Sequence, residues 1–70
     1  MKTSTESQLV DFLLPQFSER QKVHVIYILK EFDLPFNSLN VSQAARYILG
    51  IKTLEQAVES FQYFEGSILI

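Results

Sequence analysis

The residues that could carry out chemistry in this chain are few. His24 is the single histidine, and on a helix it falls with Arg20 and Glu31 toward the polar side, not beside a nucleophile. The chain has no cysteine and two glycines, which excludes disulfides, cysteine-based zinc sites and a glycine-rich phosphate loop. Glu55 and Glu59 lie one helical turn apart, but further cation ligands are missing. We therefore predict no catalytic residue, metal, cofactor or small-molecule substrate.

A helix-turn-helix is the functional pattern that the spacing of residues 41–64 suggests. Two short helical patterns, 41–49 and 53–64, flank a three-residue connection, Gly50-Ile51-Lys52. In DNA-binding versions the second helix enters the major groove, and the contacts here would come from Arg46, Lys52, Thr53 and Gln56. Against this, Glu55 and Glu59 would face the phosphates, and residues 53–70 contain no Lys or Arg. We favour an ordinary helical hairpin and keep a DNA-binding transcriptional regulator as the alternative.

Four helices must position these residues, and each has a capping signal before it. A capping box pairs a small polar residue with Glu or Gln three positions later. Thr3/Glu6, Ser18/Gln21 and Thr53/Gln56 fit this pattern, and Asn40/Gln43 is a looser variant. The predicted helices cover about residues 4–14, 18–32, 41–49 and 53–64, which indicates an all-α, small four-helix domain over residues 1–70 with a short apolar C-terminal tail.

The ends of these helices are also marked in the sequence. Pro15 cannot continue a helical hydrogen-bond ladder, so the first helix should end at Leu14. Gly50 stands where a left-handed C-cap is expected, and Gly66 is the predicted stop of the fourth helix. Residues 23–28 are rich in β-forming side chains, which leaves a strand as the rival interpretation. The cap at Ser18 and the flanking charges favour helix.

The helical periodicity predicts which apolar side chains form the core. Leu9, Val10, Leu13 and Leu14 share a face of the first helix, and Val25, Ile26, Ile28, Leu29 and Phe32 share one on the second. The turn-rich loop after it should tuck in Leu34, Phe36 and Leu39. The third helix should bury Val41, Ala44, Ala45, Ile48 and Leu49, and the fourth Leu54, Ala57, Val58, Phe61 and Phe64.

Apolar residues make up 47% of the chain, including six Phe and three Tyr, which is more than so small a core can hide. The surplus consists of residues outside the predicted core faces, namely Val23, Tyr27, Tyr63, Ile68, Leu69 and Ile70. We predict that these residues contact protein, either a second copy in a homodimer or a partner of unknown identity. The apolar tail could pair with a β-strand of another chain, and its deletion should then weaken self-association.

These features predict a small non-enzymatic interaction or regulatory module of the adaptor, inhibitor or anti-repressor type. No apolar run is long enough to span a bilayer, and the first residues lack the apolar stretch of a signal peptide. We therefore expect a cytoplasmic protein that does not insert into a membrane.

Overall fold

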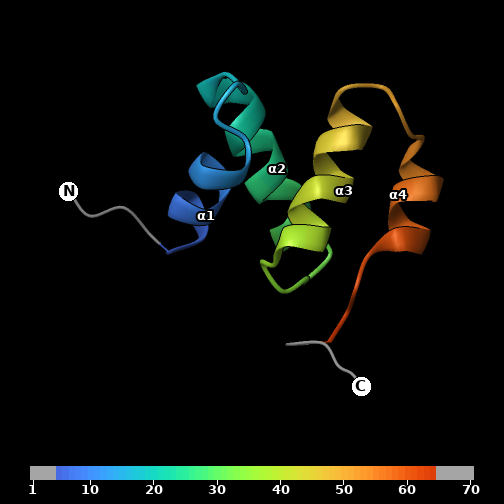
Figure 1. The fold of residues 1–70 in the computed structure, drawn as a ribbon. Coiled ribbons are helices and arrows are strands. Elements are labelled where there is room, and N and C mark those ends of the chain that lie inside the picture. Colours follow the sequence, from blue (N-terminus) through green and yellow to red (C-terminus); the bar gives the residue numbers. More distant parts are fainter. Residues whose placement is uncertain (1–4, 65–70) are drawn as a thin grey trace.

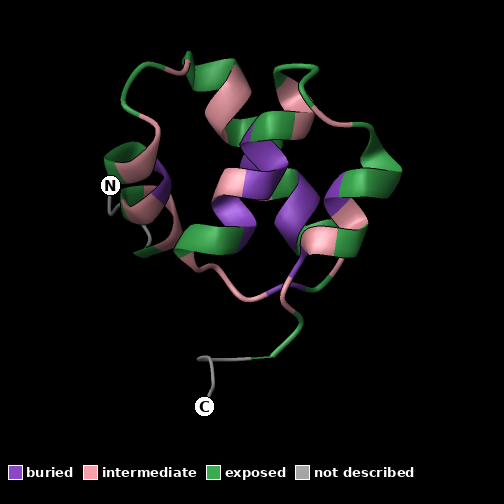
Figure 2. Cartoon of the chain, turned by 45° about the vertical axis from the view of Figure 1, so that its right-hand side comes forward, coloured by how far each residue is buried: buried purple, intermediate pink, exposed green. Residues whose placement is uncertain are grey.

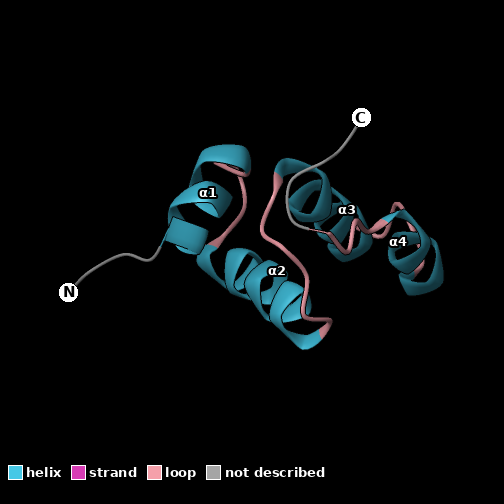
Figure 3. Cartoon of the chain, turned by 90° about the horizontal axis from the view of Figure 1, so that it is seen from below, coloured by secondary structure: helices cyan, strands magenta, loops and turns pink. Residues whose placement is uncertain are grey.

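Within residues 5–64, the part of the chain that the computed structural model describes, the backbone forms four helices and no strand. They are α1 (Thr5–Leu13), α2 (Glu19–Glu31), α3 (Ser38–Ile48) and α4 (Leu54–Ser60). The predicted all-α class is thus confirmed, and residues 23–28 are helical. α2 packs against both α1 and α3, while α4 packs against α3 alone among the four helices (Figures 1 and 3).

Two of the predicted capping boxes form as the sequence indicates. The Ser18 hydroxyl accepts from the Gln21 N–H at 3.1 Å, and the Gln21 amide oxygen accepts from the Ser18 N–H at 2.9 Å. Thr53 and Gln56 repeat this exchange at 3.2 and 3.0 Å. Each box satisfies N–H groups that a helix start leaves without an intrahelical acceptor. The predicted Thr3/Glu6 box involves Thr3, which lies outside the described residues.

The predicted cap at Asn40 is wrong, because α3 begins three residues before the expected position 41. Asn37 is the N-cap, and its side-chain oxygen accepts from the Asn40 N–H at 2.8 Å. Asn40 is instead fully buried inside α3. Its amide nitrogen donates to the Pro35 and Gln62 carbonyls, both at 2.8 Å, and its oxygen accepts from the Gln62 N–H at 2.7 Å.

The same asparagine accounts for the early end of α4, which stops at Ser60 and not at residue 64. Phe61 has extended backbone angles (φ −69°, ψ 145°). The N–H of the next residue, Gln62, donates to the Asn40 side-chain oxygen, and its carbonyl accepts from the Asn40 side-chain nitrogen. By leaving the helix here, the chain supplies two of the three hydrogen bonds of the buried Asn40 side chain, and Pro35 supplies the third.

α2 and α3 both end in a Schellman motif. After α3, Gly50 has φ 83°, and the N–H groups of Gly50 and Ile51 donate to the Tyr47 and Arg46 carbonyls at 3.0 and 2.9 Å. The predicted left-handed cap at Gly50 is therefore confirmed. After α2, Asp33 takes the equivalent position with φ 56°.

The buried residues gather where α2 and α3 meet, with α1 and α4 on either flank (Figure 2). Most of the predicted core packs there, and the rings of Phe32 and Phe61 pack with centroids 6.0 Å apart. The predictions for Leu39, Leu49, Leu54 and Phe64 are wrong, because these side chains are exposed. The earlier start of α3 places Leu39 in its first turn, and Phe64 lies beyond the shortened α4, where the helical stripe no longer applies.

Candidate functional site

An apolar groove runs between α1 and α3, with a volume of about 390 Å³. One wall is a face of α3, formed by residues three or four apart: Ser38, Ser42, Ala45, Arg46 and Leu49. The other wall comes from the end of α1 and the turn after it, through Leu13, Leu14 and Phe17, and Ile51 completes the lining. We call this feature the α1–α3 groove.

Leu49 and Ile51 are the most exposed apolar side chains of this groove, at 53% and 66%. They flank Gly50, so the hydrogen bonds of the Schellman motif fix their backbone. Arg46 is exposed beside them and makes no ion pair within residues 5–64. Among the described residues, the groove thus presents to solvent two aliphatic side chains on a fixed backbone and one unpaired cation. We call Arg46, Leu49 and Ile51 the Leu49–Ile51 patch.

A second depression, of about 450 Å³, lies between the end of α2 and α4. Phe32, Leu54 and Val58 supply its apolar lining, and Glu55 and Glu59 supply two exposed carboxylates. Neither glutamate makes an ion pair among the described residues, and no Lys or Arg lines the depression. We call this feature the acidic hollow.

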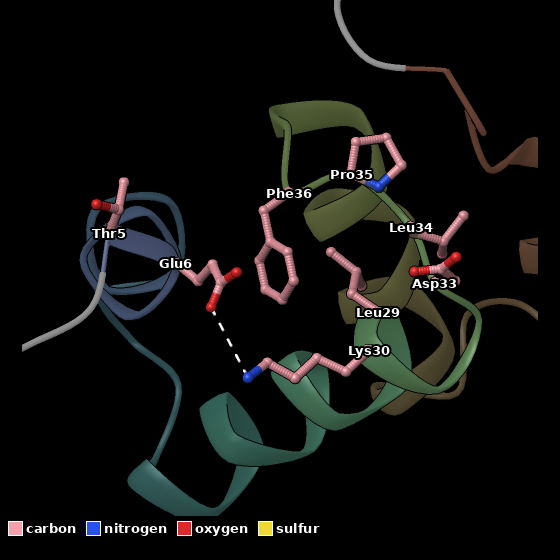
Figure 4. Close-up of a pocket in the computed structure, with 8 residues that line it drawn as sticks. All are labelled: Thr5, Glu6, Leu29, Lys30, Asp33, Leu34, Pro35 and Phe36. Atoms are coloured by element: carbon pink, nitrogen blue, oxygen red, sulfur yellow. Dashed lines mark ion pairs between the residues drawn. The ribbon is translucent and has the colours of Figure 1, made fainter.

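A third pocket, of about 480 Å³, opens between the start of α1 and the loop after α2 (Figure 4). Glu6 and Lys30 face each other across it, 3.9 Å apart, and the Phe36 ring lies between Glu6 and Leu29. Lys30, the one cation that lines this pocket among residues 5–64, is therefore already paired with a carboxylate. Within the same range, no histidine, serine or cysteine lines it.

The predicted protein-contact residues fall on separate parts of the structure. Val23 and Tyr27 are both 61% exposed, one turn apart on α2, and neither lines any of these three depressions. Tyr63 is half exposed in the segment after α4. Ile68, Leu69 and Ile70 lie outside the described residues.

The four predicted DNA-contact residues lie in different local settings. Arg46 lines the α1–α3 groove, whereas the Lys52 ammonium donates to the Gln43 and Ser60 side chains between α3 and α4. Thr53 and Gln56 are engaged in the capping box. α3 and α4 pack side by side and run in opposite directions (Figures 1 and 3).

The groups considered for catalysis or metal binding are also placed by the fold. His24 is exposed and packs edge-on against the Tyr47 ring, with centroids 6.5 Å apart. In the described part of the chain, no cluster of three His, Cys, Asp or Glu residues could hold a metal ion.

No helix between residues 5 and 64 is long and apolar enough to cross a bilayer.

Sequence reasoning missed the exposed pair Leu49 and Ile51, since it assigned Leu49 to the core and gave Ile51 no role. The signal that could have found them is the glycine between them. A Schellman turn at Gly50 reverses the chain, so the two flanking side chains cannot both continue the buried stripe of α3.

Comparisons with protein-family models, with curated proteins and with solved structures found no match to this chain.

Proposed function

We propose that this chain is a small non-enzymatic module that acts by binding protein, that it self-associates, and that the α1–α3 groove is its main contact surface. The observation that carries the proposal is the exposure of Leu49 and Ile51 at the rim of a groove already lined by apolar side chains. Contiguous apolar surface of this kind costs free energy in water and marks contact sites on small proteins.

The shape and charge of the groove support a protein ligand over a small polar one. Its α3 wall presents side chains along almost the whole 11-residue helix, which is about 16 Å long at 1.5 Å per residue. An elongated apolar surface with one cation at its edge resembles the apolar centre and polar rim of protein interfaces.

A measurement of self-association tests this proposal without knowledge of any other partner. For a contact of this limited size we expect a dissociation constant on the order of 10–100 μM, measured by sedimentation equilibrium. The double substitution Leu49→Ser/Ile51→Ser should weaken association at least about tenfold, because it removes apolar area that becomes buried in the complex.

The matched control is Val23→Ser/Tyr27→Ser, which removes an equally exposed pair from α2, outside the groove. If this control weakens association and the groove variant does not, the contact surface is the one predicted from sequence and the groove assignment is wrong. The third variant is a deletion of residues 68–70. An unchanged dissociation constant after this deletion would refute the predicted contact role of the tail. A chain that stays monomeric at millimolar concentration would overturn self-association altogether.

A further inference from the structure

The acidic hollow and the Leu49–Ile51 patch are complementary in both polarity and charge. The hollow combines an apolar lining with the exposed carboxylates of Glu55 and Glu59. The patch combines two exposed aliphatic side chains with the exposed guanidinium of Arg46. We propose that the acidic hollow of one copy receives the Leu49–Ile51 patch of a second copy. This inference rests on the proposed function and specifies the partner surface of the groove.

The ion pairs within each chain leave these groups available. Lys22 pairs with Asp11 and Glu19, and Lys30 pairs with Glu6. Lys52 donates to two side chains inside the α3–α4 hairpin. Among residues 5–64, Arg46 is thus an unpaired cation beside exposed apolar surface, and Glu55 and Glu59 are unpaired carboxylates beside an apolar depression.

The sizes of the two features are compatible. The hollow, at about 450 Å³, falls within the range of roughly 300–1,000 Å³ of clefts that enclose ligands. Leu49 and Ile51 project from a fixed turn, so inserting them costs little backbone entropy. Docking them would bring Arg46 toward Glu55 and Glu59, where a guanidinium can bind a carboxylate through two parallel hydrogen bonds.

Complementary charges select this pairing over contacts between like surfaces. A contact of hollow with hollow would oppose four carboxylates, and a contact of patch with patch would oppose two guanidinium groups. Like charges across an interface cost binding free energy, whereas opposite charges accelerate encounter and fix the register. The proposed contact places each charged group opposite its counterpart.

A charge-swap experiment with the full chain tests the pairing. Arg46→Glu and Glu59→Arg should each weaken self-association at least about tenfold. An equimolar mixture of the two variants should associate more tightly than either variant alone. Glu at position 46 of one chain then meets Arg at position 59 of the other, and Arg46 of the second chain meets the unchanged Glu55 and Glu59 of the first. Sedimentation equilibrium and circular dichroism report association and folding on the same samples.

Two controls carry the same changes in net charge at exposed positions of α2 outside both features. They are Arg20→Glu, matched to Arg46→Glu, and Glu31→Arg, matched to Glu59→Arg. We expect neither control to change the dissociation constant of self-association by more than about twofold, since exposed charges contribute little by themselves.

The outcomes separate this inference from the proposed function. If Leu49→Ser/Ile51→Ser weakens association but the charge swaps act no more strongly than their controls, the groove binds protein and the hollow is not its partner. Failure of the mixture to restore association also overturns the pairing, even when each single variant is weakened. Absence of association in the unchanged chain overturns both proposals.

Discussion

The substitution Asn40→Ala tests how one buried amide joins the end of α4 to the rest of the molecule. Asn40 is fully buried and makes three hydrogen bonds, two to Gln62 and one to Pro35. At a net 0.5–1.5 kcal/mol for each bond, we expect a loss of about 3 kcal/mol in the free energy of unfolding. The loss is large because the substitution removes all three hydrogen bonds, which link α3 to Pro35 and to the segment after α4.

This magnitude is a substantial part of the total stability of such a chain. At about 0.05–0.15 kcal/mol per residue, 70 residues give roughly 3.5–10 kcal/mol. A loss of 1 kcal/mol in the free energy of unfolding lowers the thermal unfolding midpoint of a domain of this size by about 4–8 °C. The variant should therefore melt roughly 12–24 °C lower.

Urea denaturation followed by far-ultraviolet circular dichroism measures the difference in the free energy of unfolding. The comparison holds provided that this free energy falls with urea concentration at the same slope in both proteins. Ser38→Ala is the control, because Ser38 is exposed in the first turn of the same helix; we expect a change within about 0.5 kcal/mol. A cost of less than about 1 kcal/mol for Asn40→Ala would refute the view that Asn40 determines where α4 ends.

Three further predictions concern the Schellman turns and the alternative function. Gly50→Ala should cost about 1 kcal/mol of unfolding free energy in the same urea assay, because φ is 83° and the added methyl meets no atom within 4 Å, so backbone strain alone acts. Asp33→Gly should stabilise by about 0.5 kcal/mol, since glycine relieves the strain at φ 56°; a loss of stability would show that the Asp33 side chain contributes there. Fluorescence anisotropy with a labelled DNA duplex should show no binding by micromolar protein at about 50 mM salt, because Lys52 is engaged internally and Glu55 and Glu59 are exposed. Duplex binding that disappears with added salt and on Arg46→Ala would restore the helix-turn-helix interpretation.

Local signals in the sequence predicted the helices well where their partners lie within a few residues. The capping boxes at Ser18 and Thr53 and the C-cap at Gly50 each involve groups three to five positions apart. Such interactions form within one turn of helix, so the residue types alone determine them.

The candidate site was only partly predictable. The exposure of Val23, Tyr27 and Tyr63 follows from periodicity, and the structure agrees on that exposure. The groove depends on how α1 lies against α3, which no repeat along a single helix encodes. The exposure of Leu49 and Ile51 has a local signal in Gly50, but the opposite wall that α1 supplies has none.

The sequence by itself determined the all-α class, the four helical segments and the residues that cap two of them, because these features depend on propensity and on contacts within one turn. Tertiary structure decided the start of α3, the end of α4 and the surfaces available for binding. The residue that matters most for the end of α4 is Asn40, whose side chain makes hydrogen bonds with Gln62, 22 residues away. A polar group that must be satisfied in the interior overrides the local preference for helix at residues 61–64, and only the packed chain brings the two residues together.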